Sequence, residues 1–139
     1  MRIMAVDYGD ARTGVAVSDE SSSIVGEAWV INSKREQEVA LSIADEVKAR
    51  GVSLIIVGYP KNMDGSTGQR AEKSELFAES LRSMCDVEVK LWDERLTTMS
   101  ANRVLTEVGK FGKKRKKTID AVAASLILES YLGFIKADS

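Results

Sequence analysis

Carboxylates stand at three points of the chain where a predicted strand ends or a predicted helix begins. Asp7 directly follows the apolar run Ile3–Val6, Asp93 and Glu94 end a later strand, and Asp120 lies in the first turn of the last predicted helix. Carboxylates are costly to bury without a partner. If the strands before them are parallel, their carboxyl ends open on one edge of the sheet, where open α/β sheets bind ligands. We therefore expect these acids to meet at one point.

The residue types of the chain limit the chemistry of such a site. The chain contains no histidine and a single cysteine, Cys85. This excludes a Ser-His-Asp triad, a Cys-His pair, and zinc sites made from histidine or clustered cysteines. Clustered carboxylates repel one another and need positive charge beside them. Oxygen-only ligands suit Mg²⁺ or Mn²⁺, and a pair of such ions is a known device for in-line attack on a phosphodiester.

Each acid also has a simpler explanation, which the sequence leaves open. Asp7 could be only a turn or helix-capping residue, and Asp120 could only favour the dipole of its helix. Asp93 and Glu94 compete for one position in the site, so one of them is expected to be structural, for example paired with Arg95.

A basic segment precedes the last predicted helix. The stretch KFGKKRKK, residues 110–117, carries six basic residues in eight, although the net charge of the chain is only −1. A local basic patch can bind phosphate whatever the net charge is. The simpler explanation is a solvated loop.

The apolar pattern predicts a mixed sheet with helices on both faces, in one domain spanning residues 1–139. The predicted strands are 3–6, 13–19, 27–31, 52–58 and 87–94, and the predicted helices are one that repeats Val39, Ile43 and Val47 and ends at Gly51, followed by 69–84, 100–108 and 118–135. No apolar run is long enough to span a membrane, and the N-terminus lacks the pattern of a signal peptide. We expect a soluble protein of the cytoplasm that makes no contact with a membrane.

Four stretches of the sequence resemble the motifs of the YqgF/RuvX family of bacterial proteins. They are DYGDARTGVAVSD, GYPKNMDGSTGQRA, LWDERLTT and TIDAVAASLILESYL, and they follow one another in order over nearly the whole chain. The resemblance implies an α/β protein with a ribonuclease H-like five-stranded mixed sheet. It also implies a metal-dependent nuclease.

The resemblance assigns roles to individual residues. It implies that Asp7, Glu94 and Asp120 are catalytic and hold Mg²⁺ or Mn²⁺, and that Arg12 clamps a phosphate. Strand alternation also favours Glu94 over Asp93, because it leaves Glu94 beyond the strand at the mouth of the site. The expected substrate-binding residues are Arg12, Arg95, Thr97, Lys113, Lys114, Arg115, Lys116 and Lys117. Thr97 and Thr98 could instead cap the following helix, and Ala11 stands where the family often has lysine.

The family resemblance implies nuclease action in 5′-end maturation of the 16S rRNA precursor. The alternatives are a Holliday junction resolvase, which cuts four-way DNA junctions, and a nucleic-acid-binding module without catalysis. The expected partners are nucleic acid, with RNA favoured over DNA, and a pre-ribosomal particle. The chain is expected to be a monomer or a weak homodimer.

Overall fold

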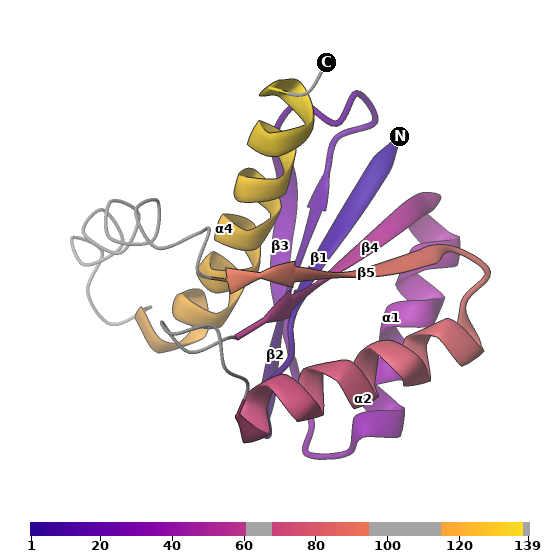
Figure 1. Ribbon diagram of the computed structural model, residues 1–139, viewed down its shortest axis with the longest axis vertical. Coiled ribbons are helices and arrows are strands. Elements are labelled where there is room, and N and C mark those ends of the chain that lie inside the picture. Colours follow the sequence, from indigo (N-terminus) through magenta and orange to yellow (C-terminus); the bar gives the residue numbers. More distant parts are fainter. Residues whose placement is uncertain (61–67, 95–114, 138–139) are drawn as a thin grey trace.

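The computed structural model describes residues 1–60, 68–94 and 115–137, with side chains in the last helix described from Ala121 to Lys136. Its centre is a five-stranded sheet in the order β3-β2-β1-β4-β5 (Figure 1). The strands are β1 (Arg2–Asp7), β2 (Arg12–Ser18), β3 (Val25–Asn32), β4 (Val52–Tyr59) and β5 (Glu88–Asp93).

The strand directions bring three carboxyl ends to one edge of the sheet. β1 pairs with β4, and β4 with β5, in parallel, whereas β2 and β3 run antiparallel to their neighbours. The central strands are apolar on both faces, and every residue from Ile3 to Val6 is fully buried. Such continuous apolar runs are typical of strands that helices cover on both sides. The edge at which β1, β4 and β5 end is therefore the expected ligand-binding edge.

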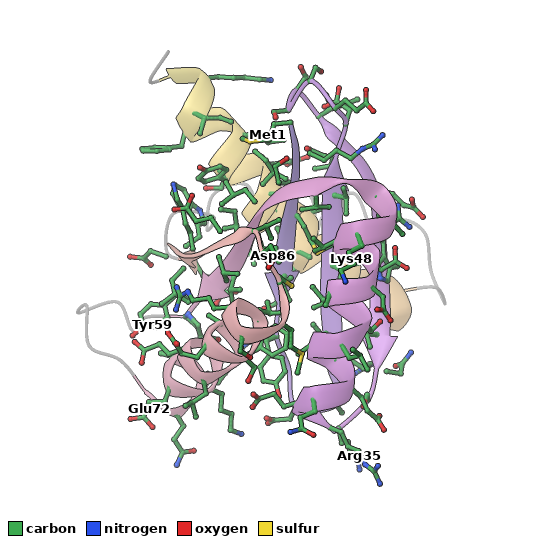
Figure 2. The ribbon with its side chains drawn as sticks, turned by 90° about the vertical axis from the view of Figure 1, so that its right-hand side faces the viewer. Met1, Arg35, Lys48, Tyr59, Glu72 and Asp86 are labelled. Carbon is green, nitrogen blue, oxygen red and sulfur yellow. The ribbon has the colours of Figure 1, made fainter. Side chains whose placement is uncertain are left out.

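Helices form a layer on each face of the sheet. α1 (Glu36–Arg50) and α2 (Gln69–Met84) pack side by side over one face, and α4 (Arg115–Ala137) packs on the other, mainly over β1, β2 and β3. Figure 2 looks onto α1 and α2, with the sheet behind them. One apolar cluster fills the layer under α1 and α2, and a second fills the layer under α4.

The two clusters show which face of the sheet each residue occupies. Met4 and Val6 belong to the cluster under α1 and α2, whereas Ile3 and Ala5 belong to the cluster under α4. This alternation follows from the two-residue repeat of a strand. Asp7, the next odd position of β1, therefore lies on the α4 face.

The predicted fold class is confirmed, with a mixed five-stranded sheet and helices on both faces. The predicted last helix was too short, since α4 begins at Arg115 rather than at Thr118. Arginine and lysine are good helix formers, so the last three residues of the basic segment continue into the helix instead of ending a loop. The predicted helix 100–108 lies outside the described residues. None of the helices in the described ranges is long and apolar enough to cross a membrane.

Candidate active site

Asp7 and Glu94 come together at the carboxyl edge of the sheet. Asp7 ends β1, and Glu94 is the first residue after β5. The two carboxyl groups are hydrogen-bonded to each other. A hydrogen bond between two carboxyls requires a proton on one of them, so this bond exists only while one member of the pair is protonated.

Gly58 of β4 makes this meeting possible. β4 lies between β1 and β5, and two strands separated by a third are about 9–10 Å apart. A Cβ atom at Gly58 would lie 2.9 Å from Oε1 of Glu94 and 2.6 Å from Cδ1 of Ile127. The missing side chain therefore opens the space through which Glu94 reaches Asp7, underneath α4.

The electrostatics of the pair follow from burial and like charge. Burial of the Glu94 carboxyl, the negative charge of Asp7 and the hydrogen bond to Asp7 together raise the pKa of Glu94 to about 7. Asp93 adds a smaller effect in the same direction, and Arg70 opposes it. Two carboxylates in one partly buried place resist the loss of the second proton. The pair is therefore a place that favours a bound cation.

Arg70 is a candidate site residue that the sequence analysis did not single out. It lies in the first turn of α2, and its Nη2 atom is 3.9 Å from Oδ1 of Asp7. Its side chain is 69% exposed, whereas that of Asp7 is 17% exposed. An exposed guanidinium beside half-buried acids can bind a phosphate with two parallel hydrogen bonds. The available signal was its place directly after the glycine-containing loop GSTGQ, at the start of a predicted helix.

The turn between β1 and β2 places Arg12 on the same face as Asp7. Asp7 pairs with Gly14 across the two strands, and Arg12 lies two residues from Gly14, so alternation gives it the same face. A Cβ atom at Gly9 would lie 2.3 Å from the backbone oxygen of Arg12. This turn therefore requires glycine at position 9.

Two contacts tie this turn to α2. The ring of Tyr8 stacks on that of Phe77, with centroids 4.3 Å apart and an angle of 13° between the ring planes. Lys73 donates a hydrogen bond of 2.8 Å to Asp10. The backbone on both sides of the site is therefore fixed by packing of α2 against the turn.

The other predicted site residues divide into three groups. Asp93 follows Val89 and Leu91 in alternation, and these pack with the cluster under α1 and α2, so Asp93 lies on the face opposite Asp7. Position 120 lies in α4, on the same stripe as Ala124 and Ile127, but its side chain is outside the described residues. The remaining ones also fall outside: Arg95, Thr97, Lys113, Lys114 and the side chains of Arg115, Lys116 and Lys117.

The described side chains do not by themselves complete a metal centre. Within residues 1–60, 68–94 and 121–136, no group of three or more Asp, Glu, His or Cys side chains could hold a metal ion. The structure brings Asp7 and Glu94 together. That these two acids and Asp120 hold a metal stays a prediction.

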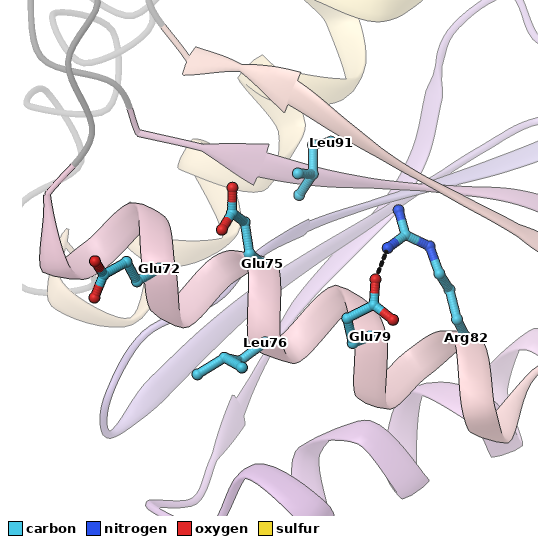
Figure 3. A pocket seen from close by; sticks show the side chains of 6 residues that line it. All are labelled: Glu72, Glu75, Leu76, Glu79, Arg82 and Leu91. Carbon is cyan, nitrogen blue, oxygen red and sulfur yellow. Dashed lines mark hydrogen bonds and ion pairs between the residues drawn. The ribbon is translucent and has the colours of Figure 1, made fainter.

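A cavity of about 550 Å³ lies elsewhere, between α2 and β5 (Figure 3). Its lining consists of Glu72, Glu75, Leu76, Glu79, Arg82 and Leu91. Arg82 is paired with Glu79 at 2.5 Å, so the cavity keeps an excess of negative charge. Because Leu91 packs under α1 and α2, this cavity opens on the face away from Asp7, and its acidic lining is unsuited to a polyanion.

Comparison with known proteins decides the family. A family model described as "RuvX: Holliday junction resolvase" matches residues 1–133. The chain belongs to the RuvX family. The resemblance seen in the sequence motifs is thereby confirmed.

Relatives of this RuvX-family protein match over nearly their whole length. A protein of Halothermothrix orenii is 49% identical over 134 residues, covering 96% of both chains, and one of Acetivibrio thermocellus is 43% identical, covering 95% of both. Each is named "Putative pre-16S rRNA nuclease". The family description and these names agree on phosphodiester cleavage, so this RuvX-family protein is a nuclease and a hydrolase.

Solved structures share the fold. Thermus thermophilus RuvC in complex with a Holliday junction substrate has a TM-score of 0.66 and 14% identity, covering 96% of both chains. The Fowlpox virus resolvase in complex with Holliday junction DNA has a TM-score of 0.64 and 13% identity, covering 97% of this chain and 99% of that one. At this identity the likeness supports the ribonuclease H-like fold alone.

Proposed function

We propose that this nuclease depends on a divalent metal ion and cleaves RNA during 5′-end maturation of the 16S rRNA precursor. The observation that carries the proposal is the Asp7–Glu94 pair at the carboxyl edge of β1 and β5, with Arg70 beside it. The carboxylate oxygens of the pair can bind a cation, and the Arg70 guanidinium can bind a phosphate. Hydrolysis of a phosphodiester at this site needs both.

The donors of this site fit Mg²⁺ or Mn²⁺. They are carboxylate oxygens, which hard divalent cations prefer, and the raised pKa of Glu94 reflects negative charge that a cation would neutralise. Asp7, Glu94 and Asp120 would hold the metal. When bound, it supplies an activated water and stabilises the charge that develops on the leaving oxygen.

The protein's own side chains bind and orient the substrate in this proposal. Arg70 and Arg12 hold phosphate oxygens, since α2 and β2 begin at these residues beside Asp7. Glu94 must give up its proton when the cation enters, because the ligand is the carboxylate. Binding of metal should therefore be weaker below neutral pH than above it.

The choice of RNA rests on the relatives. Proteins at 43–49% identity over nearly the whole chain are named for the pre-16S rRNA. The second candidate is a Holliday junction resolvase, which the description of the family favours. Both candidates hydrolyse a phosphodiester at the Asp7–Glu94 pair. They differ in the substrate, which is RNA in the first and a four-way DNA junction in the second.

One cleavage assay separates these candidates. The end-labelled substrates are single-stranded RNA, a 5′ fragment of precursor rRNA, single-stranded DNA and a four-way DNA junction. Each is incubated with Mg²⁺, with Mn²⁺ and with EDTA. Asp7→Asn tests the site, and Asp45→Asn on the exposed surface of α1 is the matched control.

We expect metal-dependent cleavage of the RNA substrates that is lost in Asp7→Asn and retained in Asp45→Asn. Asp7→Asn removes the negative charge of Asp7, which repels Glu94. The variant is therefore expected to stay folded, and its loss of cleavage would not come from unfolding. Paired nicks in the junction with the RNA intact would favour the resolvase instead. Binding without cleavage of any substrate would contradict the proposal and favour a module without catalysis.

A further inference from the structure

Three aromatic side chains, one from β5 and two from α4, gather where α4 passes β5. The ring centroid of Trp92 lies 5.2 Å from that of Tyr131 and 5.3 Å from that of Phe134, both in edge-to-face contact. Aromatic residues make up only 6% of the chain. Their concentration at this place is therefore a feature of the fold that the composition does not reveal.

The cluster has a buried side and an open side. Tyr131 is 7% exposed and belongs to the core under α4, whereas Phe134 is 53% exposed. Trp92 is half-buried, and its Nε1 donates a hydrogen bond of 3.2 Å to Ser130. Packing and this hydrogen bond fix the rings in place before any ligand binds. Binding therefore has a smaller entropic cost.

Trp92 connects the cluster with the candidate active site. Trp92 packs with the cluster under α4, the same face on which Glu94 reaches Asp7, and it precedes Glu94 by two residues, about 6.6 Å along a strand. By alternation Lys90 also lies on this face, with 48% of its side chain exposed. Glu88 begins the same row, and its carboxylate lies 4.0 Å from the Lys90 ammonium. An exposed ion pair, an aromatic ring and a site acid thus follow one another along one side of β5.

We propose that Trp92 and Phe134 form a stacking platform for unpaired bases of the substrate, and that this platform leads a single strand to the Asp7–Glu94 pair. The proposal rests on the nuclease function proposed above and specifies its substrate as single-stranded next to the cut. Every base has a flat face that can stack on an aromatic ring, whereas bases inside a duplex are already stacked. Lys90 would exchange its exposed partner Glu88 for a phosphate of the same strand.

The charges of the two faces favour nucleic acid as the occupant of this surface. The opposite face of β5 borders the cavity lined by Glu72, Glu75 and Glu79, which repels phosphate. The platform instead adjoins Arg70 and Arg12 through the acid pair. A nucleic acid strand therefore has one favourable side of β5 to follow.

A binding experiment tests the platform without cleavage. In the Asp7→Asn protein, Trp29→Phe leaves Trp92 as the only tryptophan, so its fluorescence reports on the platform. Short single-stranded RNA is titrated in EDTA, alongside a blunt RNA duplex of the same sequence. We expect the single strand to quench Trp92 and the duplex to leave its emission unchanged.

Substitutions at Phe134 identify the interaction. We expect Phe134→Ala to weaken single-strand binding about tenfold, equivalent to about 1.4 kcal/mol. Phe134→Leu should lose the same amount because it keeps apolar surface but removes the ring, and Phe134→Trp should retain binding. Leu41→Ala, at a side chain 57% exposed on α1, is the control and should bind normally.

The outcomes separate this proposal from the function on which it rests. Unchanged Trp92 emission together with normal binding by Phe134→Ala would overturn the platform, even if the wild-type protein cuts RNA. Quenching that depends on Phe134 would support the platform, even if no substrate is cut. Full binding by Phe134→Leu, or a dimer in sedimentation that Phe134→Ala abolishes, would reveal an apolar protein contact and overturn base stacking.

Discussion

At the scale of single residues, the site depends on a carboxyl pair that the fold makes unfavourable. Glu94 is brought against Asp7 in a partly buried place, and its pKa rises to about 7. Nothing in the residue sequence alone could give this value, because it arises from the burial of Glu94 and from a contact between β1 and β5. The sequence could indicate only that acids end these two strands.

This pKa has a consequence for folding stability in the absence of metal. Glu94 has an ordinary pKa of 4.5 and a folded-state pKa of about 7, so the folded protein holds this proton more tightly than the unfolded chain does. The stability that the proton contributes is complete below about pH 4.5 and is lost as pH rises through about 7. Its upper bound is about 3 kcal/mol, from 1.36 kcal/mol per pKa unit.

We predict that Glu94→Gln removes this pH dependence. In EDTA, urea unfolding should show the wild-type protein losing stability relative to Glu94→Gln between about pH 5 and pH 8, because glutamine cannot ionise. Glu72→Gln, at an exposed glutamate on α2, should follow the wild-type profile. Parallel stability profiles of Glu94→Gln and the wild type would contradict the shifted pKa.

At the scale of elements, β4 acts as the spacer of the site. Asp7 ends β1 and Glu94 directly follows β5, and the strand between these two strands carries glycine at the position that Glu94 must pass to reach Asp7. The α4 helix closes the same space from above with Ile127, which is 2% exposed. A side chain at position 58 would therefore disturb the site more than it disturbs the sheet.

We predict that Gly58→Ala lowers kcat at least about tenfold, since displacement of a reacting group by about 1 Å can cost a hundredfold. The new Cβ would stand 2.9 Å from Glu94 Oε1 and 2.6 Å from Ile127 Cδ1. Steady-state cleavage and thermal unfolding are measured together. Gly133→Ala is the control, because a Cβ there meets nothing within 4 Å, and it should raise stability without changing kcat.

The double variant Gly58→Ala/Ile127→Val separates packing from positioning. Valine lacks the Cδ1 atom, so the contact with α4 is relieved while the contact with Glu94 stays. We expect recovery of stability and a kcat that remains low. A kcat that recovers together with stability would mean that Gly58 serves only the packing of α4.

The elements also mark what sequence reasoning could and could not find. Continuous apolar runs predicted β1 and β4, because burial on both faces leaves a clear pattern. The start of α4 was placed three residues late, since lysine and arginine give no boundary signal between loop and helix. The position of Arg70 at the start of a predicted helix was a signal, but its distance of 3.9 Å from Asp7 depends on how α2 packs. The contact of Trp92 with Phe134 was missed because position along the chain does not reveal which elements pack together.

At the scale of the whole molecule, charge is separated although the net charge is only −1. The cavity between α2 and β5 has an acidic lining, and the carboxyl edge of the sheet carries the Asp7–Glu94 pair. Six basic residues lie between Lys110 and Lys117, immediately before and within the first turn of α4. Attraction of a polyanion must therefore come largely from this segment and from the arginines near the acids.

We predict that Lys113→Gln/Lys114→Gln weakens binding of single-stranded RNA and reduces its dependence on salt. Each phosphate contact with a single strand contributes about 0.7 to the slope of log K against log salt, so loss of two contacts should reduce the slope by about 1.4. Fluorescence titrations of the Asp7→Asn protein over a series of salt concentrations measure the slope. Lys34→Gln/Lys48→Gln removes the same charge from exposed positions beside and within α1, and its slope should remain that of the parent. Equal slopes for the two double variants would mean that net charge, and not the basic segment, holds the strand.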